Sequence, residues 1–152
     1  MQINIGLEKV EKILHVADIH IRNFKRHKEY RQVFRKLYKD AKQLPKNSII
    51  YVAGDIVHTK TDISPELVEL TSEFFRKLAD IRPTIVITGN HDANLNNSSR
   101  LDALSPIIDN LNHPNLHYLK DSGIYRVCDI DFIVMSVFND PKDFPDATKA
   151  TG

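Results

Sequence analysis

The sequence contains no uninterrupted apolar run that approaches the roughly 18 residues needed to cross a membrane. Residues 1–6 also lack the basic segment, followed by an apolar one, that marks a secretory signal. A single cysteine, Cys128, cannot form an internal disulfide and is typical of a protein from a reducing compartment. We therefore expect a cytoplasmic or nuclear protein without a membrane partner.

The chain is 152 residues long, which is enough for one domain with a substantial core. Three short runs rich in β-branched residues predict strands at 12–17, 49–53 and 84–88, each apolar on both faces as in a buried parallel sheet. Apolar residues at helical spacing predict helices at about 26–43 and 65–80. This βαβαβ order predicts an α/β fold with parallel strands and right-handed crossovers.

The C-terminal part of the sequence has a different pattern. Short apolar runs at 116–119, 124–127 and 132–137, separated by turn-forming residues, indicate an antiparallel meander. Residues 139–152 have almost no apolar periodicity, so we expect an irregular tail there. Residues 1–138 are then expected to form the folded part of the chain.

Polar residues that can bind metals begin where each of the first three predicted strands ends. Asp18 and His20 follow the first strand, Asp55 follows the second, and Asn90 and His91 follow the third. The carboxyl ends of neighbouring strands in an open α/β sheet converge on one crevice. Oxygen and nitrogen ligands without a thiolate argue against a structural zinc finger and favour Mn²⁺, Fe or Zn²⁺ in an open catalytic site.

The segments 17–20, 53–58 and 88–92 resemble the signature of the calcineurin-like metallophosphoesterases, which reads Asp-x-His, Gly-Asp and Gly-Asn-His-Asp or Gly-Asn-His-Glu. The resemblance implies the layered α/β fold of that family. It also implies a hydrolase that uses divalent metals to act on a phosphoester.

This resemblance also implies a set of metal ligands. Asp18 and His20 bind one ion, Asp55 bridges to a second ion, and Asn90 binds that second ion. We expect Mn²⁺ first, with Fe or Zn²⁺ as alternatives. Two such ions stabilise both oxygens of an in-line displacement at phosphorus and activate the attacking water.

The same resemblance gives catalytic roles to two histidines. His91 donates a hydrogen bond or a proton to the phosphate or its leaving group, and Asp92 is the partner that orients His91. His58, three residues after Asp55, resembles a histidine of the SbcD-type nucleases of DNA double-strand-break repair. That histidine contacts the phosphate or the flanking backbone, and those nucleases work with a partner ATPase.

Two later histidine motifs of this family, a Gly-His and a Gly-His-x-His, are missing C-terminal to His91. His113 and His117 lie in that range without the glycine context, so we do not expect them to bind metal. We therefore expect residues 1–138 to be the N-terminal part of a metallophosphoesterase domain, with one weak metal site or none and inefficient hydrolysis alone. An unpaired sheet edge near 132–137 is then expected to favour a homodimer.

The predicted first helix is strongly basic. Positions 22 to 42 hold nine lysine or arginine residues against two acids. Arg31, Arg35 and Lys39 face away from the helix's apolar stripe and form a candidate track for a DNA backbone. A solvated helix face explains the same residues, so both interpretations stay open. The predicted stripe comprises Tyr30, Val33, Phe34, Leu37, Tyr38 and Ala41.

These residues leave three hypotheses for the function. The first is a DNA exonuclease or endonuclease of the SbcD type that uses water activated by the metals. The second is a phosphoesterase that acts on small phosphoesters or phosphoproteins. The third is a non-catalytic module that binds DNA or a partner protein, which the missing histidine motifs favour.

Overall fold

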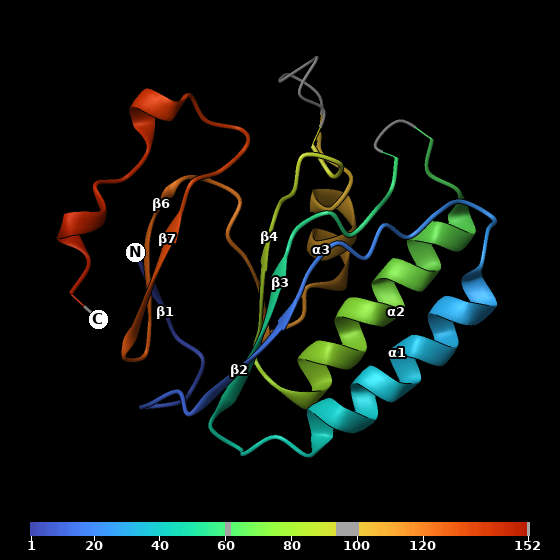
Figure 1. Cartoon of the computed structure of the whole chain (residues 1–152), viewed down its shortest axis with the longest axis horizontal. Coiled ribbons are helices and arrows are strands. Elements are labelled where there is room, and N and C mark those ends of the chain that lie inside the picture. The colour runs from blue at the N-terminus through green and yellow to red at the C-terminus, as the bar shows by residue number, and fades with distance from the viewer. Residues whose placement is uncertain (60–61, 94–100, 152) are drawn as a thin grey trace.

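The protein forms two β-sheets that pack face to face, with helices on the outer face of the larger sheet (Figure 1). The computed structural model describes residues 1–59, 62–93 and 101–151. One core cluster lies between the larger sheet and the helices, and a second cluster joins the sheets, where the Tyr51 and Phe132 rings lie 5.3 Å apart. The mixed α/β class predicted from the sequence is confirmed.

The larger sheet is four-stranded and parallel, in the order β2-β3-β4-β5. Its strands and helices alternate along the chain as β2 (Lys12–Val16), α1 (His27–Lys42), β3 (Ser48–Ala53), α2 (Pro65–Ile81), β4 (Thr84–Ile87), α3 (Ser105–Leu111) and β5 (Leu116–Tyr118). Val16 pairs with Val52, and Ala53 pairs with Ile87, so the first three strands end at nearly the same level. The loops that follow these strands therefore meet at one edge.

The smaller sheet has the order β1-β6-β7, with strands β1 (Gln2–Ile3), β6 (Gly123–Val127) and β7 (Ile130–Val134). β6 and β7 are antiparallel, as predicted, and β7 is an edge strand, as expected for the region near 132–137. The prediction that 116–119 begins the meander was wrong, because β5 pairs in parallel with β4. The helix α3 lies between these two strands in the chain and serves as the crossover that parallel pairing requires.

β2 is one of the two outer strands of the larger sheet, whereas its apolar run had predicted burial on both faces. Ile13 is 43% exposed and His15 is exposed, because no described strand pairs with the other side of β2. An apolar run of this length has the same composition in a central strand and in an edge strand, so its sequence could not reveal the edge.

The two long helices pack side by side against the sheet (Figure 1). Phe34 of α1 and Phe74 of α2 form the closest ring contact, with centroids 4.5 Å apart. Val33 is 63% exposed and was wrongly placed in the buried stripe of α1. Among the described residues, no helix is long and apolar enough to cross a membrane.

After β7 the described chain contains two short 3₁₀ helices and no further strand, which matches the irregular character predicted for residues 139–152. These helices are η1 (Pro141–Asp143) and η2 (Ala147–Lys149). The boundary of the folded part at residue 138 stays a prediction.

Candidate metal centre

The loops after β2 and β3 run side by side beyond the end of the sheet. The His20 amide donates to the Asp55 carbonyl at 2.9 Å, and the His58 amide donates to the Ile21 carbonyl at 2.9 Å. Ile21 also forms an isolated parallel bridge with Val57. These backbone bonds extend the parallel pairing and place the side chains of both loops over one edge.

Asp18, His20 and Asp55 form the first candidate metal-binding group. Each offers one ligand atom, and these atoms all lie within 4.8 Å of one another. The His20 Nε2 lies 3.8 Å from an Asp18 carboxylate oxygen. Two carboxylates and one imidazole form an oxygen-rich donor set that suits Mn²⁺. The structure therefore brings together three of the residues that the sequence predicted as ligands.

All three of these residues have left-handed backbone conformations. The φ angles are 54° at Asp18, 51° at His20 and 53° at Asp55. Each such conformation costs a non-glycine residue about 1–3 kcal/mol, and residues of this kind cluster at functional sites. The three strained residues are thus the ones whose side chains form the first candidate metal-binding group. The sequence did not predict this backbone strain.

Two glycines allow the loops after β3 and β4 to approach closely. A Cβ atom on Gly54 would lie 2.5 Å from the Gly89 nitrogen, and one on Gly89 would overlap the Asp55 side chain. Gly54 also has a φ of 78°, which alanine adopts only with strain. Gly54 is therefore required by the close approach of the two backbones, and Gly89 also leaves room for the Asp55 carboxylate.

We expect Gly54→Ala to destabilise the fold more than Gly6→Ala, measured by urea unfolding. Both glycines have positive φ, which costs alanine about 1–2 kcal/mol. Only a Cβ on Gly54 meets other atoms; at Gly6 nothing lies within 4 Å. Overpacking should add about 1–3 kcal/mol at Gly54. Equal losses in the two variants would show that the loops do not need this close approach.

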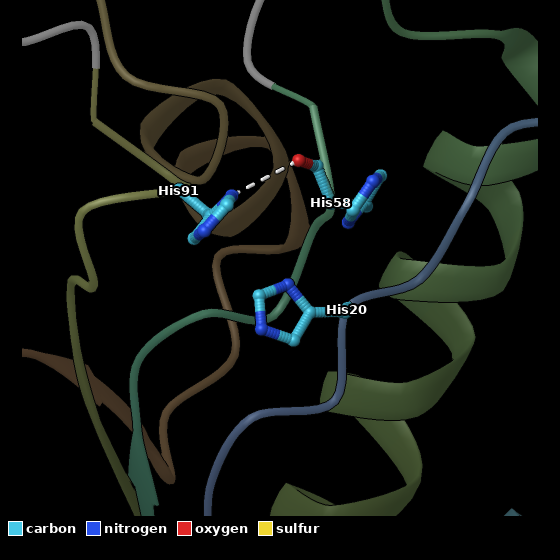
Figure 2. Close-up of side chains that lie close together, drawn as sticks. All are labelled: His20, His58 and His91. Atoms are coloured by element: carbon cyan, nitrogen blue, oxygen red, sulfur yellow. Dashed lines mark hydrogen bonds between the residues drawn. The ribbon is translucent and has the colours of Figure 1, made fainter.

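His20, His58 and His91 form a second candidate metal-binding group, whose ligand atoms also lie within 4.8 Å of one another. The rings of His58 and His91 are stacked at 5.9 Å, and the His20 ring stands edge-on to both (Figure 2). Burial lowers the pKa of His58, and the nearby charge of Arg22 lowers this pKa further. These imidazoles come from all three loops, so the predicted catalytic histidines lie beside the predicted ligand His20.

Asp92 joins the loops after β3 and β4 instead of orienting the His91 ring as predicted. Its Oδ1 accepts the amides of Ile56 and Val57, both at 2.9 Å, and its Oδ2 accepts the Gly89 amide at 3.0 Å. The side chain is fully buried, and this burial raises the pKa of Asp92 to about 6. The prediction is corrected because a carboxylate buried under two loops is satisfied by their backbone amides.

His91 takes its orientation from the loops around it. Its Nδ1 donates to the His58 carbonyl at 3.2 Å, and its amide donates to the Asp55 carboxylate at 2.9 Å (Figure 2). Asn90 lies between Gly89 and His91 and is exposed. The predicted second metal position thus has Asp55 and Asn90 on adjacent loops. The oxygen and nitrogen donors of these loops fit divalent metals without a thiolate.

Tyr30 was predicted only as part of the apolar stripe, but its hydroxyl donates to the His20 carbonyl at 2.6 Å. The first turn of α1 is thereby attached to the loop that carries Asp18 and His20. A cavity of about 420 Å³ lies beside this attachment and is lined by the end of β2 and one face of α1. The sequence does not distinguish a partly buried tyrosine that makes this hydrogen bond from one that only packs.

The predicted DNA-binding residues differ in their surroundings. Arg31 is ion-paired with Glu73 and lies 3.6 Å from Glu69, so its charge is largely compensated. Arg35 and Lys39 are exposed and line a cavity of about 540 Å³ between α1 and α2. The structure therefore leaves two of the three predicted cations available to a ligand.

Comparison with known proteins shows which family contains these loops. A family model described as Calcineurin-like phosphoesterase matches residues 11–147, which include all three loops. A protein of Acanthamoeba polyphaga mimivirus, called Uncharacterized protein R555, is 50% identical over 146 residues. The alignment covers 94% of this chain and 11% of the relative, so the chain spans a small part of that protein's length.

Proposed function

Because the chain belongs to the calcineurin-like phosphoesterase family, we propose that it is a metal-dependent phosphodiesterase that acts on DNA. The metal-dependent phosphoesterase class follows from the family and from the two candidate metal groups. The observation that carries the choice of DNA is the attachment of the basic helix α1 to the metal loop through Tyr30.

In the proposed reaction, the loops after β2, β3 and β4 supply the metal ligands and the histidines. Asp18, His20, Asp55 and Asn90 would hold the divalent ions, which would neutralise phosphoryl oxygens and acidify a bound water. The His91 Nδ1 donates to the His58 carbonyl, which leaves its Nε2 free to face the phosphate or the leaving group. His58 lies beside His20 and His91, where it would contact the phosphate or the flanking backbone.

A polyanionic substrate accounts for the charge on α1. Arg35 and Lys39 lie one helical turn apart, which corresponds to a rise of about 6 Å along the axis. Both are exposed, and α1 begins at the loop that carries His20. A DNA strand is long enough to contact both the metals and these cations, whereas a small phosphoester is not.

From the resemblance to SbcD-type nucleases, we further propose that the protein is an exonuclease or endonuclease of DNA repair. We also propose that Mn²⁺ is its working metal and that it acts with a partner ATPase. His58 supports them because it joins His20 and His91 in one cluster. β7 at the edge of the smaller sheet supports a homodimer as a further partner state.

We expect the double variant Arg35→Gln/Lys39→Gln to bind duplex DNA more weakly and with a flatter salt dependence. If each cation contacts one phosphate, the slope of log K against log[salt] should fall by about 1.8. Fluorescence anisotropy over a salt series measures this slope. The matched control Lys142→Gln/Lys149→Gln removes the same charge from the C-terminal 3₁₀ helices and should leave the slope unchanged. Equal slopes in all proteins would contradict the DNA track.

Cleavage assays with Mn²⁺ test the reaction itself. Single-stranded and double-stranded DNA are compared with nitrophenyl phosphate, and a chelator should abolish any turnover. We expect slow cleavage of DNA and less of the small substrate. Hydrolysis of nitrophenyl phosphate without cleavage of DNA would favour the small-phosphoester function instead.

A non-catalytic DNA-binding module is the second candidate. The observation in its favour is that, among the described residues, the predicted second metal position has Asp55 and Asn90 as its protein ligands. Two protein ligands hold a second ion weakly, so hydrolysis by this chain alone should be inefficient. Salt-dependent DNA binding with no cleavage at any Mn²⁺ concentration would support this candidate.

A further inference from the structure

Two imidazole nitrogens at the strand-end loops are buried without a hydrogen-bond partner. Among the residues that the structure describes, the Nδ1 atoms of His20 and His58 both have this property. Buried polar atoms are nearly always hydrogen-bonded, and an exception is commonly explained by a bound ion or water. The assigned roles of His20 and His58 leave this property unexplained.

The two nitrogens belong to one cluster with His91. Figure 2 shows a nitrogen of the His20 ring pointing between the rings of His58 and His91. The other His20 nitrogen, Nε2, faces the Asp18 carboxylate. Because the His91 Nδ1 proton is held by the His58 carbonyl, the lone pair of the His91 Nε2 is available to a metal. The cluster thus offers three neutral imidazoles from three loops.

We propose that His20, His58 and His91 form a three-imidazole site for a single Zn²⁺ ion, with Nδ1 of His20 as one ligand. Zn²⁺ accepts three histidines with one open position, and its bonds to nitrogen are about 2.0–2.1 Å long. In a tetrahedral site the nitrogens then lie about 3.3 Å apart. One nitrogen of each of the three rings already lies within 4.8 Å of one nitrogen of the other two, so the rings would have to move closer to hold the ion.

This site differs from the group formed by Asp18, His20 and Asp55. A neutral imidazole binds one ion through one nitrogen, so His20 serves one position at a time. The carboxylate group favours Mn²⁺, whereas the imidazole group favours Zn²⁺. Zinc binding of this kind requires no phosphoesterase activity, so it is tested independently of the proposed function.

Long-range ¹H–¹⁵N NMR of the histidine rings tests the proposal on the unaltered chain. One equivalent of ZnCl₂ should shift the Nδ1 signal of His20 to the value of a metal-bound nitrogen and should also shift ring signals of His58 and His91. Binding through Nε2 of His20, with His58 and His91 unchanged, would place the ion with Asp18 and Asp55 and overturn the proposal.

Calorimetric Zn²⁺ titrations of single variants give a second readout. Loss of even an outer partner of a metal ligand weakens binding by about 10–100-fold, so His58→Ala should weaken Zn²⁺ at least by about tenfold. His15→Ala is the control, because it removes an exposed imidazole from β2, and it should change the affinity by less than about twofold. Circular dichroism checks that each variant is folded. An unchanged affinity in folded His58→Ala, or an equal loss in His15→Ala, would overturn the site.

Discussion

Replacing Asp92 by alanine is expected to lower the free energy of unfolding by about 3 kcal/mol or more. The substitution leaves the amides of Ile56, Val57 and Gly89 without their acceptor. Each buried donor that loses its partner costs about 1–3 kcal/mol. Urea unfolding followed by circular dichroism measures the loss.

Asp18→Asn is the comparison for this variant. The Asp18 side chain is 78% exposed and asparagine tolerates its left-handed backbone, so the change should alter stability by less than about 0.5 kcal/mol while it weakens Mn²⁺ binding. The change at Asp92 is thus expected to lower stability, whereas the change at Asp18 is expected to weaken Mn²⁺ binding. Equal stability of the two variants would contradict the role of Asp92 as the link between the loops.

The second large effect is expected for His20→Ala. His20 is the residue shared by both candidate metal groups, so its loss should weaken Mn²⁺ and Zn²⁺ binding alike. We expect a decrease of about hundredfold for each ion, at the upper end of the range for partners of metal ligands. Calorimetric titration with each ion measures the change.

His15→Ala is the matched control for His20→Ala, because it removes an exposed imidazole from the preceding strand. Both affinities should stay at the wild-type level in this control. A His20→Ala protein that still binds Mn²⁺ normally would mean that the ion is held elsewhere, and the carboxylate group would have to be abandoned.

The position of the site follows from features that a sequence displays. Strands at 12–17, 49–53 and 84–88 were each predicted within one or two residues, and each was followed by polar residues. Parallel strands joined by helices end at the same edge of a sheet. That rule alone predicts that Asp18 and Asp55 lie close together.

Other features depend on neighbours that are remote in the sequence. The edge position of β2 and the parallel pairing of β5 depend on which strands lie next to them, and short apolar runs are similar in both settings. The partners of Asp92 are backbone amides, which almost all residue types have, so the residue types around Asp92 do not predict these hydrogen bonds. The unpartnered Nδ1 of His20 is likewise a property of the packed loops.

The central claim is that the loops after β2 and β3 bind a divalent metal through Asp18, His20 and Asp55. An anomalous difference map from crystals soaked in MnCl₂ tests this claim most directly. We predict the strongest peak within bonding distance of a carboxylate oxygen of Asp55 and of Nε2 of His20. A strongest peak away from these loops, or no peak at millimolar Mn²⁺, would contradict the claim.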